Sequence, residues 1–315
     1  MERFGDENGM PWFSYIGKIL ILIGMVLVFG GIGVLVSNYL CTLIYGIDIS
    51  QLNLNNIKKE DVQLIASLKL VQTLGGGFGM FLIPSLLFPR VVSLHANTLI
   101  GYAVKPKFWS IGVSLLFVFI TVPLISWFYQ INQLLSFPAD FKDLEMSIRT
   151  MENQAGVLTK IFVAADSIPM LLLNLFVVAL VPAVCEEFFF RGVLQKYTQL
   201  KFNSAWAAII VSALVFSGFH GQFYGFLPRF ALGVVLGFLY FQTSSIWVPI
   251  VAHFVNNGLA VVMAYYASNL SGFAIFDESY QFEWYFVLAS LLSTVMLFYF
   301  TSWYSSLNKN TVLES

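Results

Sequence analysis

Charged residues are scarce in this sequence. Asp, Glu, Lys and Arg make up 10% of its 315 positions, whereas a soluble globular domain carries about 25%. The 58% of apolar residues excludes a disordered chain, and 16 basic against 17 acidic residues exclude a nucleic-acid binder with a basic surface. An ordinary cytosolic enzyme is excluded by the same shortage of charge. The composition that remains is typical of a polytopic membrane protein.

Cysteine is almost absent, and so is any sign of a cleaved leader. Cys41 and Cys185 both lie inside apolar runs, which excludes a disulfide framework and a cysteine-based zinc module. Acidic residues outnumber basic ones in the first eight positions, and the apolar run 19–44 lacks a small-residue cleavage site. We therefore expect that run to stay in the protein as a first membrane span.

Long apolar runs are what the sequence has in abundance. A span needs about 20 largely apolar residues, so the sequence predicts an all-α bundle of about eight transmembrane helices. The modest loops predict one integral-membrane domain over 1–315, with 167–266 as its motif-bearing catalytic core. No internal repeat supports a transporter with inverted repeats. The expected spans are 18–44, 68–88, 108–130, 167–199, 204–221, 229–243 (short for a span), 247–266 and 284–304.

Loop charges predict an orientation. Lys and Arg gather in the loops after the second and fourth spans, whereas the loop before the last span carries Asp277, Glu278 and Glu283 and no base. With an even number of spans, both termini are then expected in the cytoplasm. The lack of a targeting segment fits a bacterial plasma membrane. The charged segment 131–163 would lie outside, as an amphipathic surface segment.

Ionisable side chains at membrane depth cost several kcal/mol unless they are paired or functional. Glu187 has Arg191 four residues later, an acid-first spacing that favours an ion pair on a helix. We expect this pair to be a structural brace; without the pair, Arg191 would be free to bind a substrate carboxylate. Glu186 has Phe190 at the same offset, so it has no local counter-charge and suits general-base chemistry. The alternative for Glu186 is a polar bridge between helices.

Two histidines also fall within predicted spans. His220 lies about as far beyond the turn around residue 202 as Glu186 lies before it, so an antiparallel helix pair would bring both to one level. His253 and Asn257 are four residues apart and share a helix face. Both could donate to a developing oxyanion, or they could simply bond a neighbouring membrane helix.

Three short patterns together resemble the motifs of one family. They are the Glu-Glu-x-x-x-Arg pattern within Cys185–Gly192, the Phe-x-x-x-His pattern of Phe216–His220, and the His-x-x-x-Asn pattern of His253–Asn257. The sequence resembles the CAAX prenyl endopeptidase and bacteriocin-processing (CPBP or Abi) family of intramembrane proteases over about residues 170–265. The resemblance implies an eight-helix bundle with the site residues Glu186, His220, His253 and Asn257, supported by Glu187 and Arg191.

What the resemblance implies is hydrolysis of a peptide bond in a membrane-associated substrate, either a prenylated CaaX-type protein or a peptide precursor. Glu186 would activate a water molecule that His220 orients. His253 and Asn257 would stabilise the oxyanion. The expected partners are the lipid bilayer and a lipidated or transmembrane peptide, with no nucleic acid. Ser217 lies near His220 in sequence, but no serine or cysteine nucleophile is needed.

Cofactor use and protein class each leave an alternative. A metal-free glutamate site is expected, because the HExxH helix is absent and no acid is evident to orient the histidines. If zinc were bound, Glu186, His220 and His253 would form the two-His, one-Glu set of catalytic zinc sites. A non-catalytic membrane partner, such as a bacteriocin-immunity factor or an anchoring subunit, is the alternative to an enzyme.

Overall fold

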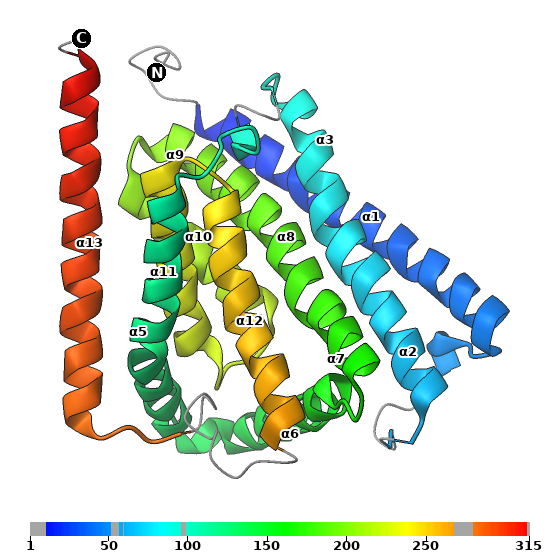
Figure 1. Cartoon of the computed structure of the whole chain (residues 1–315). Coiled ribbons are helices and arrows are strands. Elements are labelled where there is room, and N and C mark those ends of the chain that lie inside the picture. Colours follow the sequence, from blue (N-terminus) through cyan, green and yellow to red (C-terminus); the bar gives the residue numbers. More distant parts are fainter. Residues whose placement is uncertain (1–10, 52–56, 59, 96–98, 268–279, 314–315) are drawn as a thin grey trace.

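The chain folds into a bundle of helices. The computed structural model describes residues 11–51, 57–58, 60–95, 99–267 and 280–313, and every regular element in these ranges is helical (Figure 1). The predicted all-α membrane fold is therefore confirmed.

Seven helices in the described part of the chain are long and apolar enough to cross a membrane. An eighth apolar helix, α10 (Ala205–Phe219), is shorter. Each predicted span corresponds to one of these eight. The seven long helices are α1 (Trp12–Tyr45), the α2–η3–α3 helix (Val62–Val91), α5 (Phe108–Leu134), the α7–η5–α8–η6–α9 helix (Ile168–Phe202), α11 (Phe226–Thr243), α12 (Trp247–Ala267) and α13 (Trp284–Leu313).

The shortest span is the fifth, and not the sixth as the sequence predicted. Helix α10 ends before His220 and Gly221, whose φ of 64° is easily adopted by glycine. Helix α11 instead begins three residues earlier than expected, at Phe226, because Pro228 is tolerated in a first helical turn. Two short helices thus meet at a turn, residues 220–225, which we name the His220 loop.

The fourth span is one continuous helix that carries the first motif, and we call it the motif helix. It begins after Ser167 with Pro169 in its first turn, as expected, and ends at Asn203, whose φ is 48°. Ser204 then caps α10 by accepting a hydrogen bond from the Ala207 backbone N–H. This tight turn makes α10 the antiparallel neighbour of the motif helix. Its segments are α7 (Ile168–Asn174), η5 (Leu175–Leu180), α8 (Val181–Glu187), η6 (Phe188–Gln195) and α9 (Lys196–Phe202), of which η5 and η6 are π-helical.

Glycine allows α1 to pack closely on η3, the π-helical segment Gln72–Leu82 that joins α2 (Val62–Val71) to α3 (Ile83–Val91). A Cβ atom added to Gly79 would lie 2.6 Å from the Phe29 carbonyl oxygen. Small residues at such contacts let two membrane helices approach backbone to backbone.

Helix α6 (Lys142–Val163) lies across one end of the bundle, and the start of α1 and the end of α13 lie at the opposite end (Figure 1). Its position matches the surface segment expected over 131–163. The assignment of either end to the cytoplasm remains a prediction, and two residues used for it, Asp277 and Glu278, lie outside the described residues.

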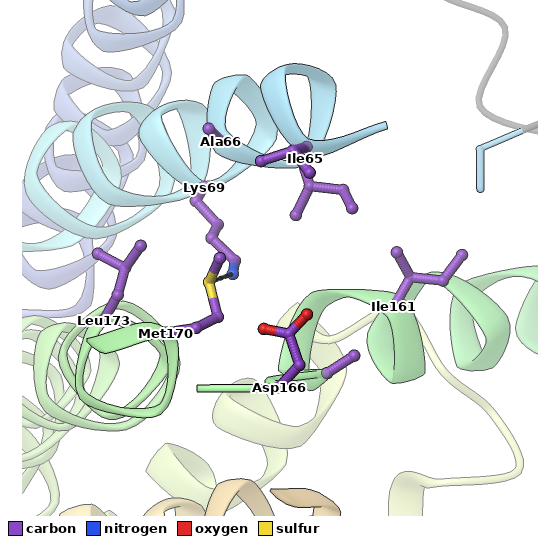
Figure 2. A pocket seen from close by; sticks show the side chains of 9 residues that line it. Ile65, Ala66, Lys69, Ile161, Asp166, Met170 and Leu173 are labelled. Carbon is purple, nitrogen blue, oxygen red and sulfur yellow. Dashed lines mark hydrogen bonds between the residues drawn. The ribbon is translucent and has the colours of Figure 1, made fainter. Parts of the chain in front are cut away.

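The last residues of α6 are tied to the bundle through Asn174 of α7. Its Nδ2 donates to the carbonyl oxygens of Val163 at 2.9 Å and Ala164 at 3.2 Å. Its Oδ1 accepts from Nζ of Lys69, a buried lysine of α2, at 2.5 Å. Figure 2 shows the Lys69 side chain extending from α2 toward Met170 across a cavity of about 90 Å³. Helices α2, α6 and α7 are therefore joined by one buried amide.

Candidate functional site

Glu187 lies at the centre of a buried polar cluster. It is the last residue of α8, and its side chain is fully buried. Its Oε1 accepts a hydrogen bond from Nη1 of Arg191 at 2.7 Å and a second from Nδ1 of His253 at 2.8 Å. The expected contact between Glu187 and Arg191 is thus present. The same oxygen also joins the motif helix to α12.

Arg191 bonds α11 as well as Glu187. Its Nη2 donates to the Gly233 carbonyl oxygen at 3.2 Å, and its guanidinium carbon lies 4.6 Å from the centroid of the Phe216 ring. One turn later, Gln195 Nε2 donates to the Gly237 carbonyl oxygen at 2.9 Å. Both acceptors are glycines, and a Cβ on Gly237 would lie 2.7 Å from Gln195 Oε1. Since Arg191 is fully buried and engaged, it is not free to bind a substrate carboxylate.

Glu186 is placed differently from its neighbour Glu187. Its side chain is 16% exposed, and its buried Oε2 has no hydrogen-bond partner among the described residues. That oxygen lies 4.0 Å from Nε2 of His253. The imidazole of His253 therefore lies between two carboxylates, with Nδ1 bonded to Glu187 and Nε2 directed at Glu186.

The two histidines contact one aromatic ring. The Phe216 ring centroid is 5.1 Å from that of His220 and 5.9 Å from that of His253. Nδ1 of His220 bonds the Phe216 carbonyl oxygen at 2.9 Å. Asn257 follows His253 by one turn of α12, and its Oδ1 accepts from Nδ2 of Asn256 at 3.2 Å. The structure thus gathers residues of all three motifs around Phe216 and Glu187, whereas Asn257 makes no hydrogen bond to Glu186, His220 or His253 within the described residues.

One sequence-based argument about the site is corrected by this geometry. The sequence showed no acid to orient a histidine, because Glu187 was assigned only to Arg191. In the structure Glu187 bonds both Arg191 and His253. In addition, His220 and Glu186 make no direct hydrogen bond or ion pair within the described residues. Helical spacing predicted a common level for the two side chains, but the direction of the His220 ring depends on its bond to the Phe216 carbonyl oxygen.

Ser217 and Cys185 lie near the site in sequence, and both side chains are buried. Ser217 is buried and donates to the Phe226 carbonyl oxygen at 2.6 Å. Cys185 is completely buried, and a Cβ on Gly77 would lie 3.5 Å from its Sγ. Both placements agree with a site that uses neither residue as a nucleophile.

The zinc alternative finds no ready ligand set. Among the described residues, no group of three or more His, Cys, Asp or Glu side chains is placed to hold a metal ion. Nδ1 of His220 and Nδ1 of His253 bond Phe216 and Glu187, which leaves Nε2 as the open nitrogen of each ring. The described side chains as placed do not fit a three-ligand site. Catalysis without a metal remains a prediction.

The His220 loop is held by helices that sequence reasoning did not connect to the site. Asn132, near the end of α5, donates through Nδ2 to the Phe223 carbonyl oxygen at 2.9 Å. Its Oδ1 accepts from the Leu227 backbone N–H at 2.7 Å. Glu152 of α6 accepts from the backbone N–H groups of Phe223 at 2.6 Å and Tyr224 at 3.1 Å. The loop backbone is thus fixed from two sides.

The Tyr224 side chain completes this attachment of α6. Its hydroxyl donates to Oε1 of Glu145 at 3.1 Å, and the Arg149 guanidinium lies 3.7 Å from its ring centroid. A hydrogen bond from the Phe137 backbone N–H, with help from neighbouring side chains, lowers the pKa of Glu145 to about 2. Glu145, Arg149 and Glu152 follow one another at i, i+4 and i+7, so they share a helix face. This spacing is the sequence feature that could have indicated which face of α6 contacts the bundle.

The helices and the buried cluster define a class: an integral membrane protein that encloses ionisable side chains within its bundle. Residues 168–259 match the family model described as type II CAAX prenyl endopeptidase Rce1-like. This range contains all three motifs, and the match confirms the family resemblance inferred from them.

Bacterial membrane proteins are among the relatives of the chain. It is 31% identical over 115 residues to the candidate membrane peptidase YdiL of Bacillus subtilis, which covers 36% of this chain and 44% of YdiL. It is 33% identical over 109 residues to the membrane-embedded CAAX protease MroQ of Staphylococcus aureus. That alignment covers 33% of this chain and 42% of MroQ. A third relative, the uncharacterized YpbD of Bacillus subtilis, is 31% identical over 103 residues, which cover 33% and 49%.

These alignments span less than half the length of each relative. No solved structure gives a comparable match. The apolar helices and the bacterial membrane relatives together identify an integral membrane protein, as expected.

Proposed function

We propose that the protein is an intramembrane endopeptidase that hydrolyses a peptide bond of a membrane-associated substrate, with Glu186 as the general base. The observation that carries this proposal is the placement of Glu186 Oε2, which has no partner and lies 4.0 Å from Nε2 of an oriented histidine. This separation is too long for a direct hydrogen bond, and a small outward shift of the partly exposed Glu186 side chain would admit one water molecule between the two atoms.

In this mechanism Glu186 accepts a proton from the bridging water as the water oxygen attacks the scissile carbonyl carbon. The C–N bond then breaks, and Glu186 returns the proton to the leaving amine. The products are a carboxylate and an amine, and no covalent intermediate forms on the protein.

Glu187 determines what His253 can do in either protonation state. A carboxylate accepts hydrogen bonds, so Nδ1 of His253 carries a proton when it bonds Glu187 at 2.8 Å. In the neutral imidazole Nε2 is then an acceptor, which suits it to hold the attacking water beside Glu186. Donation to an oxyanion, the role expected from the sequence, requires the imidazolium form.

Asn257 is the proposed neutral donor to the oxyanion. Its Oδ1 is occupied by Asn256, which directs the amide so that Nδ2 is the group left to donate. His220 is proposed to orient the attacking water through Nε2, since its Nδ1 bonds the Phe216 carbonyl oxygen. Glu187 and Arg191 are proposed to support the site by orienting His253 and by fixing α11.

The test is a cleavage assay with purified protein in detergent. The substrates are a farnesylated CaaX peptide and a panel of secreted-peptide precursors, and new termini are identified by mass spectrometry. Glu186→Gln is expected to keep the fold and abolish cleavage, because the amide is isosteric but cannot accept the water proton. Glu60→Gln, a change at an exposed acid, is the matched control.

Wild-type cleavage rates in the Glu186→Gln variant would remove Glu186 from the mechanism. Binding of a peptide by the wild-type protein without turnover would favour the non-catalytic membrane partner.

A further inference from the structure

A polar cavity of about 590 Å³ lies between α6, the end of α5 and the His220 loop. Its charged lining residues are Arg149, Glu152 and Lys160 of α6 and Arg229 of α11. A volume in this range is typical of pockets that bind small ligands or short peptide segments.

The charges of the lining do not cancel. Arg149 is engaged, since its Nε donates to Glu145 at 3.1 Å. Glu152 is also engaged, because its carboxylate accepts from the backbone N–H groups of the His220 loop. In the described part of the chain, neither Lys160 nor Arg229 has a carboxylate within 4.0 Å. Two cations therefore face the cavity without a counter-ion.

Arg229 connects the cavity to the candidate site. It lies in the first turn of α11, where the helix dipole disfavours a cation, so its position is not explained by helix stability. Its Nη1 donates to the Gly225 carbonyl oxygen at 2.9 Å, which leaves its other N–H groups available. Gly225 belongs to the loop that begins with His220, so this bond fixes Arg229 against the His220 loop. An anion bound by Arg229 would therefore lie beside the His220 loop.

We propose that this cavity binds a carboxylate of the peptide substrate, close to the scissile bond, through Arg229 and Lys160. The inference rests on the proposed function and adds a substrate class to it: peptides with an acidic side chain or a free chain end near the cleavage position. The planar fork of Arg229 can bind a carboxylate through two hydrogen bonds. Lys160 of α6 adds a second charge to the lining.

A lipid headgroup has the same charge, but it fits the site less well. A phosphate held by Arg229 would fill the cavity beside the His220 loop without bringing a peptide bond to the site. A carboxylate carried by the substrate itself places charge and scissile bond together.

The experiment measures binding to the Glu186→Gln protein in detergent, so that no peptide is consumed. The probes are two pairs of fluorescent, N-acylated heptapeptides, and anisotropy gives their dissociation constants. In the first pair a free C-terminal carboxylate is compared with a carboxamide. In the second pair, both C-terminally amidated, an internal Glu is compared with Gln.

In at least one pair the acidic peptide is expected to bind about tenfold more tightly, the effect of one hydrogen-bonded charge. A preference in the first pair identifies a chain end, and one in the second pair identifies a side chain. Adding Arg229→Gln or Lys160→Met should bring the ratio close to one. Lys107→Met, a change at an exposed lysine just before α5, should leave the ratio unchanged.

Charge reversal gives a second measurement. Lys160→Glu should weaken binding of the acidic peptide and strengthen binding of a peptide with Lys at the same position. Equal affinities within both pairs for the parent protein would overturn the proposal.

The lipid alternative has its own result. If phosphatidylglycerol in mixed micelles raises the thermal stability through Arg229 and Lys160, while both peptide pairs bind equally, the cavity holds a headgroup and the proposal fails. Failure of the proposed function would look different, because no peptide would be cleaved by the wild-type protein while the preference for acidic peptides persisted.

Discussion

Asn257 lies one helical turn beyond His253, and its amide nitrogen is the proposed donor to the oxyanion. Asn257→Ala should leave peptide binding nearly unchanged and lower turnover by about 10²–10³, the usual effect of losing one such donor. Steady-state kinetics that separate kcat from KM provide the measurement. A rise in KM alone would reassign Asn257 to substrate positioning. Asn256→Ala, which removes only the neighbour that bonds its Oδ1, is expected to have the smaller effect.

A double-mutant cycle would test whether Glu187 and Arg191 are energetically coupled. Arg191→Met strands a buried carboxylate and should cost about 3–5 kcal/mol of folding free energy. Glu187→Gln with Arg191→Met removes both charges and should recover much of that stability. Activity should recover less, because Glu187 also orients His253 at 2.8 Å. The measurement is thermal stability in detergent, with cleavage assayed in parallel. Additive losses in stability would contradict a coupled pair.

Residue spacing predicted one of the two bonds to Glu187, and the reason is geometric. Arg191 follows by four residues on the same helix, so helical periodicity places it correctly. His253 is 66 residues away on α12, and its distance from Glu187 depends on how two helices are rotated about their axes. Periodicity within one helix holds no information about that rotation.

At the scale of helices, α5 and α6 determine the position of the His220 loop. Asn132 is 1% exposed and uses both ends of its amide on the loop backbone. Asn132→Ala should lower stability by about 1–3 kcal/mol, because it leaves partly buried backbone groups without their partner. It should also lower kcat, since His220 begins the loop. Gln130→Ala, on the same helix but bonded to Tyr280, is the control. Unchanged kcat in Asn132→Ala would show that the loop is positioned by other contacts.

The helices themselves were largely predictable, and their ends and contacts less so. Apolar runs gave all eight helices because a membrane span must be apolar along its whole length. The charges of 131–163 correctly indicated an amphipathic segment. They gave no indication of its target, because Glu152 bonds backbone N–H groups of the His220 loop, which have no sequence signature.

At the scale of the whole molecule, packing of α1 against η3 depends on glycine. Gly79→Ala should destabilise the bundle by about 1–3 kcal/mol, because its Cβ would meet the Phe29 carbonyl oxygen and force two backbones apart. Gly76→Ala is the matched control in the same segment, since nothing lies within 4 Å of a Cβ there. Thermal unfolding in detergent compares the two. Equal stability of both variants would mean that α1 shifts freely on η3.

The attachment of the His220 loop also bears on how this architecture can be divided. The family match covers residues 168–259, yet the side chains that hold the loop, Asn132, Glu145 and Glu152, all precede it. The motif region is consequently not a transplantable module. A chimera that joined residues 168–259 to the N-terminal half of a relative would keep every motif residue but lose the scaffold that aligns one histidine. Exchange of segments between relatives should therefore succeed only when α5, α6 and the His220 loop all come from the same protein.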